Sequence, residues 1–148
     1  MDEPERMNQA TGELPDIEEI QLLTFRISEV GFAVDTEQTS EIIDLDQAKS
    51  RKLEIIRFDT KIPFRGVSVT YRTPKVLMLK NEVSRGILID QMRTIIHAPL
   101  DSIHPLPPLV QFPQKPPPIW GAVLLEDEII LLVDGYSLLA GADVEGKK

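Results

Sequence analysis

Short runs of β-branched, leucine and aromatic residues, each bounded by turn-forming residues, recur from residue 20 to residue 134. Such runs favour strands, and their close spacing is typical of sandwiches and barrels. The strand candidates are 20–27, 32–35, 36–45, 52–59, 67–71, 75–80, 85–96, 119–125 and 128–134. No long helical periodicity interrupts them. The pattern therefore predicts an all-β chain of eight or nine short strands.

The two ends of the chain differ from this pattern. After the last strand candidate, Asp134 is expected to cap a short helix and Gly141 to end it. Residues 1–18 have no apolar periodicity and are strongly acidic, which predicts a disordered tail. We therefore expect a folded domain over residues 19–142 and a polar C-terminal tail over 143–148.

Proline breaks the strand pattern near the C-terminal third. Seven of the 12 prolines lie between residues 105 and 118. Proline cannot donate to a strand ladder and fixes φ, so this stretch is expected to be a rigid crossover between strands. The alternative is a polyproline II ligand for SH3 or WW domains.

Composition excludes several classes of protein. The chain has no cysteine, so disulfides and thiolate metal sites are excluded, and it has no apolar run of membrane-spanning length. We expect a soluble, cytoplasmic protein. The net charge is −8, while residues 51–80 carry eight bases and two acids. This distribution argues against nucleic-acid binding and favours a local basic face for an acidic protein partner; the alternative is solvated strand faces without a partner.

Residues suited to catalysis are sparse. His97 and His104, with Asp101 between them, could hold a metal, but their spacing matches no standard site. Residues 126–128 are acidic and fall in an expected turn, where solvation explains them better than acid–base chemistry. No nucleophile motif or phosphate-binding loop is present. We expect no enzyme and no cofactor, and keep a ligand-binding or catalytic barrel using both histidines as an alternative.

Trp120, the only tryptophan, is left with two interpretations, an interface anchor or a core residue.

Three segments in the same order resemble the CheW family of bacterial chemotaxis coupling proteins. They are "LLTFRISEVGFAVDTEQTSEII" (22–43), "KVLMLKNEVSRGILIDQMRTIIHAPLDSIHPLP" (75–107) and "IWGAVLLEDEIILLVDGYSLL" (119–139). The matching residues are Phe25, Gly31, Phe32, Val34, Asp35, Glu41, Ile42 and Ile43 in the first, Gly86, Ile87, Leu88, Ile89, Asp90, Ile103, Pro105 and Pro107 in the second, and Gly121, Asp127, Ile130, Leu131, Leu132, Asp134 and Leu138 in the third.

The resemblance implies a fold of two small intertwined five-stranded, SH3-like barrels with a short C-terminal helix. It also implies a non-enzymatic adaptor that couples a methyl-accepting chemoreceptor to a CheA-type histidine kinase. Glu41 and Ile42 match the family's "V-x-E-I" segment and are the expected protein contacts. Arg57 and Arg65 are added as contacts because of their charge, and Arg65→Glu is expected to weaken partner binding without unfolding the chain.

The chain departs from the family in its middle. Family members carry a segment like "P-x-x-I-x-G-V-x-N-L-R-G-x-I-x-P-V-I-D-L-R", which is shortened here. Either "PFRGVSV" stands for "N-L-R-G-x-I", or "LEIIRFDTKIPF" stands for "V-I-D-L-R-x-x-F"; strand spacing favours the second. Because the family uses this segment toward its partners, the shortening raises an alternative, a CheW-like fold reused with other partners in motility or signalling.

Overall fold

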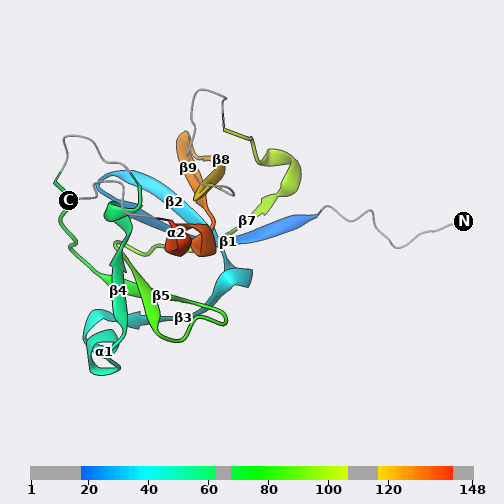
Figure 1. The fold of residues 1–148 in the computed structure, drawn as a ribbon. Helices are drawn as coiled ribbons and strands as arrows, with labels where there is room; N and C mark the ends of the chain where they lie inside the picture. The colour runs from blue at the N-terminus through cyan, green and yellow to red at the C-terminus, as the bar shows by residue number, and fades with distance from the viewer. Residues whose placement is uncertain (1–17, 63–67, 107–116, 142–148) are drawn as a thin grey trace, which may run out of the picture.

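The computed structural model describes residues 18–62, 68–106 and 117–141. Within these residues the chain forms two small β-sheets, two six-residue α-helices and three 3₁₀ turns (Figure 1). The elements are β1 (Glu19–Ile27), β2 (Val30–Asp35), η1 (Thr36–Gln38), β3 (Thr39–Asp44), α1 (Leu45–Ser50), β4 (Glu54–Arg57), η2 (Phe58–Thr60), β5 (Lys75–Leu79), β6 (Arg85–Ile89), β7 (Ile95–Pro99), η3 (Leu100–Ser102), β8 (Ile119–Leu125), β9 (Glu128–Val133) and α2 (Gly135–Ala140).

The first sheet joins the two ends of the domain. Its five strands follow the order β7-β1-β2-β9-β8. The hairpins β1–β2 and β8–β9 meet through a parallel pairing of β2 with β9, in which Gly31 lies opposite Ile130. The turns of both hairpins therefore lie at the same end of this sheet.

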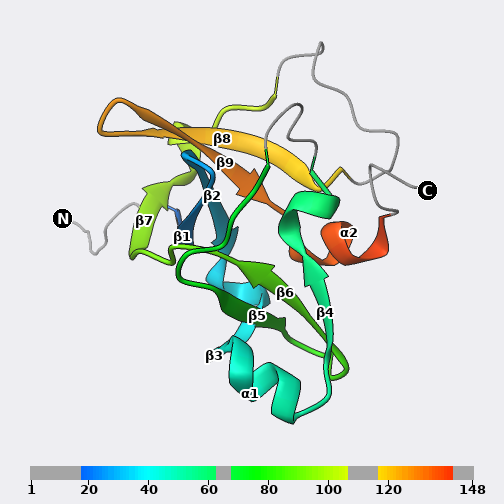
Figure 2. The same ribbon diagram turned by 90° about the vertical axis from the view of Figure 1, so that its left-hand side faces the viewer.

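The second sheet is built from the middle of the chain, in the order β3-β5-β6-β4. Strands β3, β5 and β6 pair antiparallel, and β4 pairs parallel with β6. Both edge strands, β3 and β4, flank the helix α1, which lies at the end of the molecule farthest from β8 and β9 (Figures 1 and 2).

A central hydrophobic core joins the two sheets. Three fully buried phenylalanines lie in it, Phe25 from β1, Phe32 from β2 and Phe58 from η2. Their ring centroids are 4.7 to 5.8 Å apart, with Phe58 edge-on to the other two. Leucine and isoleucine side chains of β5 and β6 close the core from the other sheet, and Leu138 and Leu139 of α2 complete it.

A polar link accompanies this core where α2 begins. Asp134 accepts hydrogen bonds from the backbone N–H groups of Tyr136 and Ser137 and so caps the helix. The side chain of Gln38 donates to Asp134 Oδ1 (3.2 Å) and accepts from the N–H of Gly135 (2.8 Å). The start of α2 is therefore fixed to η1, just before β3 begins.

Several predictions are confirmed. The fold is all-β, with nine strands among the described residues, and it consists of two sheets followed by a short helix that Asp134 caps and Gly141 ends. Within the described residues the second sheet has four strands where the resemblance implied five.

Other details differ. Residues 68–71 of the strand candidate 67–71 form no strand, because this segment is held by side chains instead: Arg72 and Thr73 donate backbone N–H groups to buried Asp90. The candidate 85–96 is divided into β6 and β7. The candidate 52–59 is strand only over β4, because the buried ring of Phe58 begins a 3₁₀ turn. Helix α1 was missed because six residues are too few to show helical periodicity.

Residues 1–17, 63–67, 107–116 and 142–148 lie outside the described residues. The predicted disordered tail, most of the proline-rich crossover and the predicted C-terminal tail therefore stay predictions.

Phe58→Ala is expected to lower the free energy of unfolding by about 3–5 kcal/mol, since it leaves a cavity where both sheets meet. Urea denaturation followed by circular dichroism measures this change. Leu124→Ala serves as the control, because Leu124 is 62% exposed and its truncation should change stability little. Equal effects of the two substitutions would show that Phe58 does not anchor the core.

Candidate protein-binding surface

Glu41 lies on the edge strand β3 with its side chain in solvent. The carboxylate Oε2 accepts two hydrogen bonds from the guanidinium of Arg51, at 2.8 and 3.2 Å. Both side chains are nearly half exposed, at 49% for Glu41 and 42% for Arg51. An ion pair this exposed contributes only about 0–1 kcal/mol, so an incoming charged group can replace either partner at little cost. No local sequence pattern predicts Arg51 as the partner of Glu41, because the two residues lie ten positions apart on different elements.

Ile42, the neighbour of Glu41, has a different environment. It is half-buried and packs against the central core. Ile42 therefore contributes to the stability of the fold as well as to any surface contact along β3. The exposed side chain of Glu41 can contact a partner without disturbing the core.

Arg57 lies on the other edge strand, β4, and is bound within its own cluster. Its guanidinium donates to both carboxylate oxygens of Asp59 (3.0 and 3.1 Å) and lies 5.0 Å from the ring centroid of Tyr71. The Tyr71 hydroxyl donates to Asp59 Oδ1 at 2.8 Å. This arrangement fixes the irregular segment containing Tyr71 against η2.

The cluster shifts the pKa values of Arg57, Asp59 and Tyr71. The hydrogen bond to Asp59 raises the pKa of Arg57. Burial of the Asp59 carboxyl acts to raise its pKa, but hydrogen bonds from Arg57 and Tyr71 and the charge of Arg57 outweigh burial, so the pKa of Asp59 is lowered. Burial, with the hydrogen bond to Asp59, raises the pKa of Tyr71 well above its usual value. The cluster therefore persists as a carboxylate between a cation and a neutral phenol at neutral pH.

The structure does not bring the expected contacts together. Glu41 and Ile42 lie on β3, while Arg57 lies on β4, and the two strands β5 and β6 separate them. Arg65 lies outside the described residues. Among the described residues, the expected contacts therefore lie on two separate sheet edges, a separation that the charge of a sequence segment could not reveal.

The two histidines are also apart. His97 lies on β7, where its Nδ1 is 3.7 Å from a carboxylate oxygen of Glu19. His104 exchanges backbone hydrogen bonds with Ala122 on the outer edge of β8. In the part of the chain that the structure describes, no three histidine, aspartate or glutamate side chains are grouped as metal ligands. Nor does any described helix have the length and apolar character to cross a membrane.

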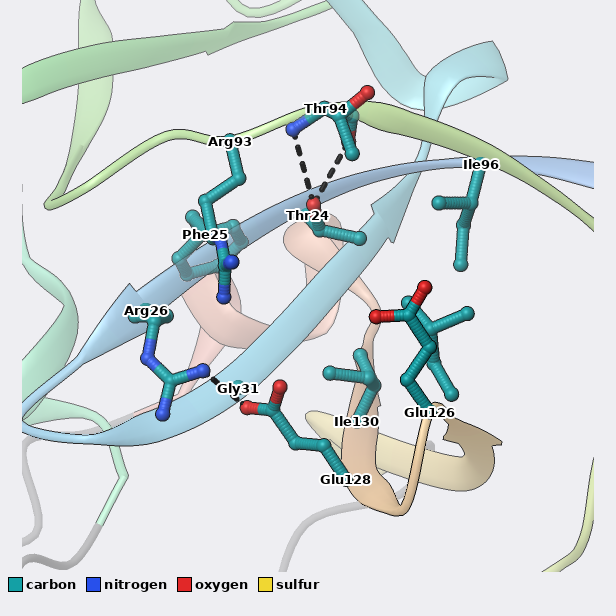
Figure 3. Close-up of a pocket in the computed structure, with 11 residues that line it drawn as sticks. Thr24, Phe25, Arg26, Gly31, Arg93, Thr94, Ile96, Glu126, Glu128 and Ile130 are labelled. Atoms are coloured by element: carbon teal, nitrogen blue, oxygen red, sulfur yellow. Dashed lines mark hydrogen bonds and ion pairs between the residues drawn. The ribbon is translucent and has the colours of Figure 1, made fainter.

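A small pocket opens at the end of the first sheet that carries both hairpin turns. It has a volume of about 190 Å³. Figure 3 shows the ion pair of Arg26 with Glu128 on one wall, and Arg93 and Glu126 on the others. Pockets for drug-sized ligands occupy about 300–1,000 Å³, so this one is below that range. It has no arrangement of a nucleophile with a general base.

Asp59→Asn is expected to destabilise the protein at neutral pH, and less so in acid. A carboxylate with a lowered folded pKa stabilises the fold above its unfolded pKa of about 3.9, and this contribution is lost as the pH falls through the folded pKa. Urea denaturation of wild type and variant from pH 7 to pH 2 measures the difference. Asp101→Asn, at an exposed residue, is the control. A difference that stays constant down to pH 2 would show that Asp59 is not held ionised by Arg57 and Tyr71.

Comparison with known proteins gives a likeness in structure alone. No family model matches the chain, and no curated protein matches it in sequence. Among solved structures, the chain is similar to the crystal structure of the scaffolding protein TtCheW from Thermoanaerobacter tengcongensis, with a TM-score of 0.58 and 15% sequence identity. The likeness covers 79% of this chain and 90% of that one. This chain therefore has a CheW-like fold, as the three sequence segments implied.

Proposed function

We propose that the protein is a non-enzymatic adaptor of bacterial chemotaxis-type signal transduction, which couples a methyl-accepting chemoreceptor to a CheA-type histidine kinase. The observation that carries this proposal is the CheW-like fold over 79% of the chain, together with the three segments that resemble the family. The proposal places the protein in the cytoplasm, where the kinase and the signalling part of the receptor lie.

The edge of β3 is the proposed contact surface. It combines an exposed carboxylate, Glu41, with an aliphatic side chain, Ile42, that is partly accessible beside the core on which it packs. An edge strand also presents backbone groups that no neighbouring strand of the sheet takes up. The weak pairing of Glu41 with Arg51 allows either side chain to turn to a partner, so binding here needs little rearrangement of the fold.

Arg57 is a weaker contact in this proposal, because its charge is already used by Asp59. A partner that binds the β4 edge would meet a guanidinium that already pairs with Asp59, so charge attraction to Arg57 would contribute less to binding. Arg65 stays a proposed contact on the ground of its charge alone.

A second candidate function is the same fold reused with other protein partners in motility or another signalling pathway. Its support is the shortened middle of the chain, together with a second sheet that has four strands among the described residues. Under this reading the β3 edge still binds a protein, but neither a chemoreceptor nor a CheA-type kinase.

A pull-down from lysate of the native organism, with the purified full chain as bait and mass spectrometry as the readout, separates the two. The coupling role predicts recovery of a CheA-type kinase or a methyl-accepting receptor. Recovery of neither by a folded bait would contradict coupling, and reproducible recovery of another signalling protein would favour the second candidate.

Glu41→Lys is expected to reduce recovery of whichever protein the wild-type bait captures about tenfold or more, because the substitution reverses the charge on the β3 edge. Its matched control is Asp101→Lys, the same charge change at an exposed residue in η3, which should leave recovery unchanged. Equal recovery with wild type and Glu41→Lys would remove the β3 edge from the interface.

A further inference from the structure

The outer part of the β8–β9 hairpin exposes an apolar pair that the central core does not cover. Leu124 of β8 and Ile129 of β9 lie directly opposite each other and are 62% and 63% exposed. By strand alternation they share a face with Leu131, which packs on the central core. The apolar face of the sheet thus continues beyond the core to a hairpin that reaches past β1 and β2 in Figure 2.

The edge of β8 beside this pair is also open. The N–H and C=O of Ala122 both bond to His104, on the outer edge of the sheet. Since these groups alternate in direction along a strand, those of Leu124 point to the same outer edge. Continuing that antiparallel register would place Ser102 opposite Leu124, but Ser102 ends the 3₁₀ turn η3 and the chain has already turned away. No described residue takes its place.

The charged residues around the pair are mostly acidic. The two turns at this end carry Glu29, Glu126 and Asp127, which are exposed and form no ion pair within the described residues. Of the two nearby guanidinium groups, that of Arg26 is bound to Glu128, and Arg93 lines the pocket. Four carboxylates against two cations leave this end negative, so it attracts a basic partner.

We propose that this hairpin surface, defined by Leu124, Ile129 and the turn at 126–127, docks an extended basic segment of another protein in which aliphatic residues alternate with lysine or arginine. The aliphatic residues cover Leu124 and Ile129, and the backbone of the segment pairs with the open edge of β8. A second copy of this chain fits poorly, since a symmetric contact would bring the same acidic turns together.

This surface is separate from the β3 edge and does not rest on the proposed adaptor role. The test uses the full chain, labelled with ¹⁵N and titrated with a capped peptide of alternating lysine and valine, and with its glutamate–valine counterpart. Amide shifts at residues 123–130 are expected with the lysine peptide alone, and added salt should weaken the binding.

Two variants test the apolar contact and the charge attraction separately. Leu124→Ser combined with Ile129→Ser removes the apolar contact, and Asp127→Lys reverses a charge; each is expected to weaken the lysine peptide about tenfold, or 1.4 kcal/mol. Asp46→Lys is the matched control, because it makes the same change at an exposed residue of α1, far from β8 and β9, and it should bind like the wild type. Any of four results would overturn the proposal. They are equal binding of the two peptides, no binding of the lysine peptide, unchanged affinity of both variants for the lysine peptide, and formation of a dimer through this face.

Discussion

The contact of three phenylalanine rings between the two sheets is the constraint on which the rest of this structure depends. Phe25 and Phe32 face each other across the β1–β2 hairpin, and Phe58 of η2, next to the second sheet, packs against both rings. Phe58 begins the 3₁₀ turn that directly follows β4, so its burial fixes where that short strand ends. Because apolar side chains fill the interior between the sheets, the polar groups that could contact a partner lie at the sheet edges and in the turns.

Three of the four aspartates among the residues that match the family accept hydrogen bonds from the backbone. Asp35 accepts from the N–H of Glu37 at the start of η1, Asp134 caps α2, and buried Asp90 accepts from the N–H groups of Arg72 and Thr73. Gly86 has a comparable role, because a Cβ there would lie 2.3 Å from Cγ1 of the stiff side chain of Val76. Their hydrogen bonds and close packing account for the presence of these residues in the motifs, and no catalytic role is needed to explain them.

Much of the fold could be predicted because apolar alternation and turn residues act locally. The hairpins, the cap at Asp134 and the end of the helix at Gly141 all depend on neighbours in sequence. What sequence reasoning missed depends on distant residues: the segment around Tyr71 is held by Asp59 and Asp90, and not by a strand ladder. The positions of the candidate contacts could not be predicted for a related reason, since Glu41 and Arg57 come from successive strands along the chain but lie on opposite edges of one sheet.

In the proposed adaptor role, this CheW-like fold presents the β3 edge of its second sheet to a signalling protein. Hydrogen–deuterium exchange of the full chain, with and without the CheA-type kinase of the same organism, tests it most directly. Slower exchange is expected at the backbone amides of Thr39–Asp44 when the kinase is bound, with β5 and β6 already protected in both states. Binding of the kinase with exchange in β3 unchanged, or no binding by the folded chain, would contradict it.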